Sequence, residues 1–113
     1  MATLDLRAQT KPTDGRQESQ HSLDVTGTYT LVYFPPRRLV KSVSVIANDG
    51  AIYWKASATE GATPDANDRK VPQSADDQLF LLDPRDISSR RPPPYGIAST
   101  TGTVNCSISI QWR

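Results

Sequence analysis

The sequence predicts an all-β protein, a small antiparallel β-sandwich or jelly-roll-like barrel of about six to eight strands with an extended N-terminal arm. The clearest evidence is the last segment, TVNCSISIQWR, in which apolar and polar residues alternate strictly from residue 104 to residue 112. Short β-branched and aromatic runs occur upstream, separated by turn-forming Pro, Gly, Asn and Asp. No convincing amphipathic helix is evident from the spacing of apolar residues. Strands therefore account for the fold.

Residues 1–25 are predicted to be an extended polar arm, and residues 26–113 the β-sandwich domain. The arm has few large apolar residues, so it cannot bury enough surface by itself to offset its ordering entropy. Within it, Leu4 and Leu6 alternate with polar residues, a pattern that suits a short strand added to a neighbouring subunit. In an isolated monomer the arm would be a flexible tail. In an assembly, Leu4, Leu6 and Arg7 are its predicted contacts.

The first strands of the domain are predicted at residues 28–34, 39–47 and 51–57. The segment 28–34, TYTLVYF, is rich in β-branched and aromatic residues and is followed by two prolines. The next two segments have apolar residues at alternate positions. Between them lies NDG (48–50), a sequence typical of a tight hairpin turn. We therefore predict that residues 39–57 form a hairpin.

Three further strands are predicted after a polar connection at residues 58–70. QLFLL (78–82) is apolar on both faces, which predicts a central position in a sheet. YGIAST (95–100) follows a long irregular stretch and leads through a short turn into residues 104–112. The alternation in this last strand predicts one buried and one hydrated face.

Length, charge and cysteine content narrow the class of protein. The chain has 113 residues, enough for one modest core. Its 13 basic and 12 acidic residues give a net charge of +1, so it lacks the basic excess of typical nucleic-acid binders, and nucleic acid is not expected as a partner. No apolar run reaches the roughly 18 residues of a membrane helix, and the N-terminus lacks the apolar core of a secretory signal. With Cys106 as the single cysteine, we expect a protein made in a reducing cytoplasm, with no membrane partner.

Candidate catalytic and metal-binding residues are few. His21 is the only histidine and lies in the polar arm, where no rigid scaffold would hold a catalytic base. Cys106 shares the apolar face of the last strand, which indicates a small buried filler. Asp65, Asn67 and Asp68 offer oxygen ligands of the kind that calcium takes, but the following residues depart from the EF-hand pattern, and turn-forming loop carboxylates are the simpler interpretation. We expect no enzymatic activity, no metal and no cofactor.

Two proline–arginine segments, FPPRRL and RRPPPYG, lie beside predicted strands and are nearly mirror images of each other. If both line one rim of the sandwich, Arg37, Arg38, Arg90 and Arg91 would face a partner's carboxylates or phosphates. The alternative is that these arginines lie at loop ends and only keep the sheet edges soluble.

The second segment also contains PPPY (92–95), which matches the Pro-Pro-x-Tyr pattern that WW-type adaptor domains bind. Because a predicted strand begins at this tyrosine, we interpret Tyr95 and the prolines as a stiff part of the contact rim. Burial of Tyr95 in the sheet would exclude adaptor docking.

Residues 26–113 contain RRLVKSVSVIANDGAIYWKAS, then a polar loop, DDQLFLLDPRDI and the closing strand pair PPYGIASTTGTVNCSISIQW. In this order of segments, they resemble the small β-sandwich virion proteins of tailed bacteriophages. The resemblance implies a non-enzymatic structural protein, a capsid decoration or a neck or tail accessory, that binds a repeated site and stabilises assembly through its arm and its proline–arginine rim. The implied partners are other virion structural proteins and further copies of the chain. The implied location is the virion, after synthesis in the host cytoplasm.

A second class of function stays open, a soluble β-sandwich module that recognises a carbohydrate, a nucleic acid or a host protein through its loops. An exposed Trp54 or Tyr53 would favour sugar stacking, whereas a buried Trp54 would favour the structural role.

Overall fold

The alternating segment at the end of the chain forms the longest strand, β9 (Val104–Trp112), and this strand lies inside a four-stranded sheet. Its apolar side chains are buried, and most of the polar side chains between them are half-buried on the other face. The predicted division into a core face and an outer face is confirmed.

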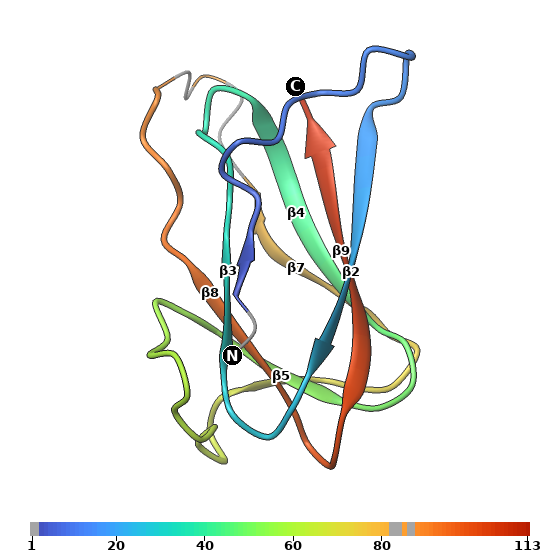
Figure 1. Ribbon diagram of the computed structural model, residues 1–113, viewed down its shortest axis with the longest axis vertical. Helices are drawn as coiled ribbons and strands as arrows, with labels where there is room; N and C mark the ends of the chain where they lie inside the picture. The colour runs from blue at the N-terminus through green and yellow to red at the C-terminus, as the bar shows by residue number, and fades with distance from the viewer. Residues whose placement is uncertain (1–2, 82–84, 86–87) are drawn as a thin grey trace.

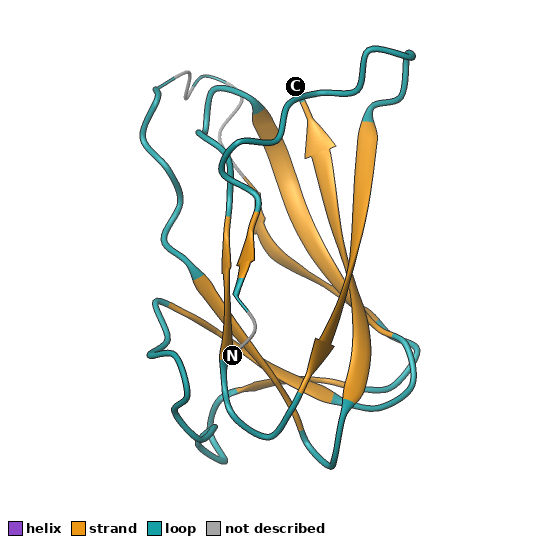
Figure 2. Ribbon diagram, in the orientation of Figure 1, coloured by secondary structure: helices purple, strands orange, loops and turns teal. Residues whose placement is uncertain are grey.

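The computed structural model describes residues 3–81, 85 and 88–113. In this part of the chain nine strands form two stacked sheets, a β-sandwich (Figures 1 and 2). The first sheet has the order β1-β3-β8-β5-β6 and the second β2-β9-β4-β7. Neighbouring strands are antiparallel except for β1 and β3, which are parallel. The strands before β9 are β1 (Leu4–Asp5), β2 (Glu18–Val25), β3 (Thr30–Tyr33), β4 (Val40–Ala47), β5 (Ile52–Ala56), β6 (Arg69–Val71), β7 (Asp76–Leu81) and β8 (Tyr95–Ser99).

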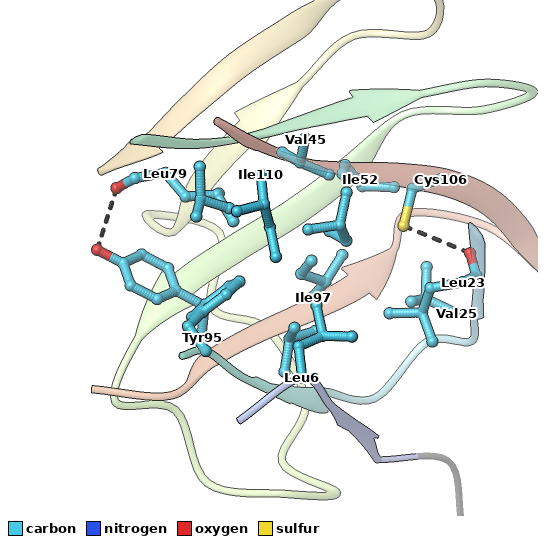
Figure 3. Packing of buried hydrophobic residues seen from close by; sticks show 14 of the residues in the cluster. Leu6, Leu23, Val25, Val45, Ile52, Leu79, Tyr95, Ile97, Cys106 and Ile110 are labelled. Carbon is cyan, nitrogen blue, oxygen red and sulfur yellow. Dashed lines mark hydrogen bonds between the residues drawn. The ribbon is translucent and has the colours of Figure 1, made fainter. Parts of the chain in front are cut away.

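One hydrophobic core fills the space between the two sheets (Figure 3). Ile52 and Ile97 enter it from the first sheet, and Val45, Ile108 and Ile110 enter it from the second. All five side chains are fully buried. Burial of each such side chain stabilises the fold by about 1.5–3 kcal/mol, so the packed inner faces fix the positions of the loops at both ends.

The predicted hairpin at residues 39–57 is wrong. β4 pairs with β7 and β9 in the second sheet, whereas β5 pairs with β6 and β8 in the first, so the turn at 48–50 carries the chain across the core. Two strands with one apolar face each bury those faces equally well side by side or in facing sheets, and alternation does not distinguish the two arrangements. Gly50 allows a close passage here, because a Cβ at this position would lie 2.7 Å from the Cγ2 of Val104. β8 and β9 likewise lie in different sheets.

Residues 18–25, expected to belong to a polar arm, form the edge strand β2. It pairs with β9 along its whole length without a register shift. Leu23 and Val25 point into the core, while polar residues occupy the first part of the strand. The expected boundary at residue 25 therefore differs from the structure. The backbone ladder to β9 orders a sequence that has too few apolar side chains to be recognised as a strand.

β7 lies at the edge of the second sheet, and its predicted central position is wrong. A register shift between Val43 and Ser44 of β4 leaves Leu79 without a directly opposed partner. This β-bulge allows the consecutive residues Leu79 and Phe80 both to pack towards the core, while Leu81 is 64% exposed. The bulge therefore explains why the segment is apolar on both faces without being central.

Candidate partner-binding surface

The two proline–arginine segments lie side by side at one end of the sandwich, as predicted. The backbone N–H of Arg37 donates to the carbonyl oxygen of Arg90 at 3.0 Å, and the N–H of Arg38 donates to that of Ser88 at 3.0 Å. Figure 1 shows the two segments at the end that also carries the C-terminus. We refer to residues 35–38 and 88–94 as the arginine rim. The rim joins the end of the first sheet to the end of the second.

Three of the prolines of the arginine rim are buried beneath its surface. Pro35, Pro36 and Pro92 are buried, and the N–H of Leu39 donates to the carbonyl oxygen of Pro36 at 3.0 Å to close the turn. A buried proline leaves no unpaired N–H, and its fixed φ reduces the entropy lost on folding. The base of the rim is therefore rigid, and only the arginine side chains extend from it.

Arg113 forms hydrogen bonds with the main chain of the arginine rim and of the residues that follow it. The backbone N–H of Arg113 donates to the carbonyl oxygen of Leu39 at 3.0 Å, and its Nε donates to the carbonyl oxygens of Arg37 and Val40 at 3.1 and 3.0 Å. Lys11 Nζ in turn donates to the main-chain oxygen of Arg113 at 3.1 Å. Sequence reasoning missed Lys11 and Arg113, because no local motif links positions so far apart in the chain.

Three of the four arginines of the rim face solvent, whereas the Nε of Arg37 is buried. The side chains of Arg38, Arg90 and Arg91 are exposed, and Arg37 is half-buried. Among the residues that the structure describes, Arg38, Arg90 and Arg91 form no ion pair. Like charges held together on a rigid base repel one another, and this repulsion is relieved when a partner supplies anionic groups.

The predicted arm contacts are used within the chain itself. Leu4 lies in β1 and packs against the core, while Leu6 is 2% exposed and donates its N–H to the carbonyl oxygen of Tyr33 at 2.9 Å. Arg7 Nη2 lies 2.6 Å from Asp5 Oδ2, and its guanidinium carbon is 4.7 Å from the ring centroid of Tyr33. Hydrogen bonds from Arg7 lower the pKa of Asp5 to about 2. Both leucines thus pack against their own sandwich.

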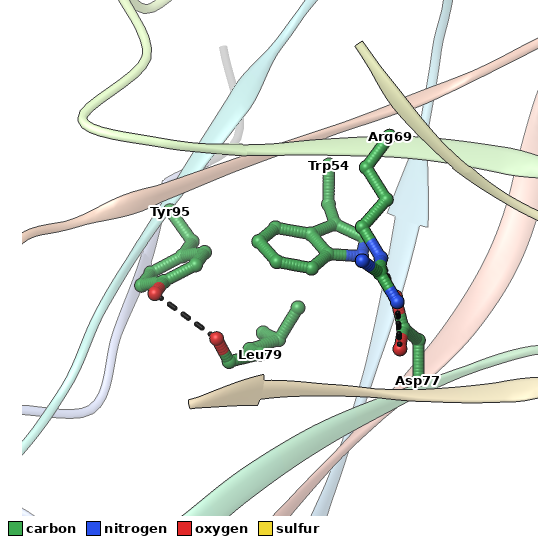
Figure 4. Close-up of polar contacts among 5 residues, drawn as sticks. All are labelled: Trp54, Arg69, Asp77, Leu79 and Tyr95. Carbon is green, nitrogen blue, oxygen red and sulfur yellow. Dashed lines mark hydrogen bonds and ion pairs between the residues drawn. The ribbon is translucent and has the colours of Figure 1, made fainter. Parts of the chain in front are cut away.

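Tyr95 lies beneath the arginine rim and takes no part in its exposed surface. The side chain is only 8% exposed, and its hydroxyl donates to the carbonyl oxygen of Leu79 at 3.0 Å (Figure 4). Its ring centroid is 5.9 Å from that of Phe34, 5.6 Å from that of Phe80 and 5.4 Å from that of Trp54. Burial raises the pKa of Tyr95. The expected contact role of Tyr95 is therefore corrected to a supporting one, and a WW-type domain cannot reach it.

Trp54 belongs to a polar cluster that the sequence did not reveal. Its Nε1 donates to Asp77 Oδ2 at 2.8 Å, Arg69 Nη2 donates to Asp77 Oδ1 at 3.0 Å, and the Arg69 guanidinium carbon lies 5.5 Å from the Trp54 ring centroid (Figure 4). Burial raises the pKa of Asp77, but hydrogen bonds from Arg69 and Trp54 outweigh it, so the pKa is lowered overall. The three residues come from β5, β6 and β7. β5 and β6 are neighbours in the first sheet, and the packing of the two sheets brings β7 close to them.

The single cysteine is fully buried in the core, whereas the single histidine is half-buried on the edge strand β2. Cys106 is fully buried, and its Sγ donates to the carbonyl oxygen of Leu23 at 3.4 Å. Burial raises the pKa of Cys106 to about 12, so the reactive thiolate is scarce at neutral pH. His21 is half-buried on β2, and burial lowers its pKa. The described residues contain no cluster of three or more His, Cys, Asp or Glu side chains that could hold a metal ion.

The carboxylates considered as calcium ligands hold their own loop together. The N–H of Asn67 donates to Asp65 Oδ1 at 2.9 Å, and the N–H of Asp65 donates to Asp68 Oδ2 at 3.0 Å. Asp68 Oδ2 also accepts a hydrogen bond from the Tyr29 hydroxyl at 2.5 Å. This hydrogen bond lowers the pKa of Asp68. The turn interpretation of this loop is confirmed.

Comparison with protein-family models, with curated proteins and with solved structures finds no match to this chain. Within the described residues, no helix is long and apolar enough to cross a membrane.

Proposed function

We propose that this chain is a non-enzymatic structural subunit that binds a partner through its arginine rim. The setting implied by the sequence resemblance is the virion of a tailed bacteriophage. The proposal rests on one observation. Backbone hydrogen bonds link Arg37 to Arg90 and Arg38 to Ser88, so that the two segments, whose prolines are partly buried, form one surface. A surface fixed before binding loses little conformational entropy when it associates.

The chemistry of the arginine rim favours an acidic protein surface as its partner. Proteins that bind single-stranded nucleic acid combine basic side chains with exposed aromatic rings on which bases stack. Of the aromatic residues close to the rim in sequence, Phe34 and Tyr95 are buried, and the half-buried ring of Tyr33 lies against the Arg7 guanidinium. The remaining surface offers guanidinium groups, which form paired hydrogen bonds with carboxylates. We therefore propose that the partner presents aspartate or glutamate side chains.

The alternative, a carbohydrate-binding module, has weaker support. Sugar stacking requires a free aromatic face, and the Trp54 ring is half-buried between Tyr95 and the Arg69 guanidinium. An open polar hollow of about 570 Å³ is lined by side chains that could hydrogen-bond hydroxyl groups, but it contains no aromatic residue. Its lining residues are Arg16, Gln17, Glu18, Gln20 and Gln111.

The proposal is tested by incorporation into particles. Virions assembled with the wild-type chain or with the R38E/R91E variant are purified by density gradient, and the chain is quantified by mass spectrometry against the major capsid protein. We expect the wild-type chain at a constant ratio and the variant reduced by roughly tenfold or more, because both exposed cations are replaced by anions.

The matched control is K55E/K70E, which changes the net charge by the same amount at exposed positions away from the rim. It should be incorporated like the wild type. Absence of the wild-type chain from purified particles, or normal incorporation of R38E/R91E, would show that the proposal is wrong.

A further inference from the structure

The charged residues are divided unevenly between the two ends of the molecule. The molecule is 37 Å long and 25 × 23 Å across. Figure 1 shows that the β1–β2 connection, the β3–β4 turn, the segment before β8 and the C-terminus gather at one end of the long axis. The β2–β3 turn, the β4–β5 turn, the β5–β6 connection and the start of β7 lie towards the other end. We call these the basic end and the acidic end.

Most basic residues belong to segments of the basic end, which includes the arginine rim. Five acidic residues belong to the same segments in the sequence. Two of them, Asp83 and Asp86, lie outside the described residues. Even with all five counted, positive charge is in clear excess. The basic residues of this end are Arg7, Lys11, Arg16, Arg37, Arg38, Lys41, Arg85, Arg90, Arg91 and Arg113.

The acidic end has the opposite balance. Only Lys55, Arg69 and Lys70 are basic there, and Arg69 is already paired with Asp77. Asp76 is exposed and, within the described residues, its carboxylate forms no hydrogen bond or ion pair. The acidic residues of this end are Asp24, Asp49, Glu60, Asp65, Asp68, Asp76 and Asp77.

We propose that copies of this chain associate head to tail, with the arginine rim of one copy against the acidic end of the next. This inference rests on the proposed function and identifies its acidic partner as a second copy of the chain. A two-fold contact between rims, or between acidic ends, would bring like charges together. Among contacts between the ends of the long axis, only the head-to-tail one pairs opposite charges, and such a contact repeats into a ring or an open chain.

The cross-section of the molecule limits the area of this contact. A cross-section of 25 × 23 Å limits the buried area to roughly 600 Å² per subunit, below the roughly 800 Å² of a standard specific interface. The contact is therefore weak in solution and depends on charge, so it strengthens at low ionic strength and where other contacts hold copies in register.

Sedimentation velocity of the purified chain tests the inference. We expect the weight-average sedimentation coefficient of the wild type to rise with protein concentration at about 50 mM NaCl, and the association to weaken by about tenfold or more at about 500 mM NaCl. R38E/R91E and E60K/D76K, which reverse charge at opposite ends, should each stay monomeric. An equimolar mixture of the two variants should associate, because each supplies the charge that the other lacks.

K55E/K70E is the matched control, since it changes the net charge as R38E/R91E does but makes the acidic end more acidic. It should associate at least as strongly as the wild type. A wild type that stays monomeric at low salt, association that is unaffected by R38E/R91E, or a mixture that stays monomeric would each overturn the head-to-tail contact. If R38E/R91E is lost from particles while the purified wild type does not self-associate, the proposed function stands and this inference fails.

Discussion

The two sheets of the sandwich differ in their outer faces. The outer face of the second sheet is open and polar, and Asn105 Nδ2 donates across it to Ser22 Oγ at 2.8 Å and Asp24 Oδ1 at 2.9 Å. The outer face of the first sheet is partly covered, so that Tyr29, Leu31 and Ala98 are buried although they lie outside the core cluster.

The β5–β6 connection is part of this cover. The N–H of Tyr29 donates to the carbonyl oxygen of Ala62 at 2.9 Å, and Ala58 approaches Gly96 closely. All five residues of β8 are buried, so this strand has no hydrated face. The irregular β5–β6 connection thus acts as a third layer over the first sheet.

Leu6→Ala tests whether the segment around β1 is an integral part of the first sheet. The side chain is 2% exposed, so its truncation should lower the free energy of unfolding by about 2–5 kcal/mol in urea denaturation. Leu81→Ala, at an exposed position of the second sheet, is the matched control and should change stability by less than about 0.5 kcal/mol. Equal and small effects would mean that the segment is a detached arm.

Gly96→Ala tests the cover of the first sheet. The added Cβ would lie 2.5 Å from the Cβ of Ala58 and 2.9 Å from the Cδ1 of Tyr29, so either the β5–β6 connection or the Tyr29 ring must shift. We expect a loss of about 1–3 kcal/mol in the same assay. Ser44→Thr also adds one methyl group, but to the open outer face of the second sheet, and should be nearly neutral. A neutral Gly96→Ala variant would argue against a packed cover.

Tyr29→Phe tests how the β5–β6 connection is held, and it should lower Tm by only a few degrees. It removes the hydroxyl that donates to Asp68 and lowers the pKa of that carboxyl. A carboxyl with a lowered folded-state pKa stabilises the fold above its unfolded pKa, and this contribution is lost as pH falls through the folded pKa. The wild type should therefore lose Tm more steeply below about pH 4 than Tyr29→Phe does. Parallel profiles measured by thermal unfolding between neutral pH and pH 2 would contradict the role of this hydrogen bond.

The sequence predicted the all-β class, and it predicted best where local chemistry decides the outcome. β9 alternates because one face is buried and the other is not, and this pattern is visible without the rest of the chain. The arginine rim was also predictable in part, since prolines and arginines stand at strand ends in both segments. Lys11 and Arg113 were not, because they join the rim only through hydrogen bonds to main-chain oxygens of residues far away in the chain.

Strand partners were beyond what the sequence determines. β4 and β5 have the alternation and the turn of a hairpin, yet they lie in different sheets. β2 has a mostly polar sequence, yet it is a full partner of β9. Alternation records which face of a strand is buried, and it contains no information about which strand is its neighbour.

Local sequence patterns were therefore enough to predict that this protein is built from strands and that two of its loops are rich in proline and arginine. The folded structure was needed to show which sheet each strand joins, that Tyr95 lies beneath the rim, and that the segments rich in basic and in acidic residues gather at opposite ends of the molecule. The physical reason is that burial of apolar surface acts without direction, whereas strand pairing and the separation of charge depend on contacts between residues far apart in the chain.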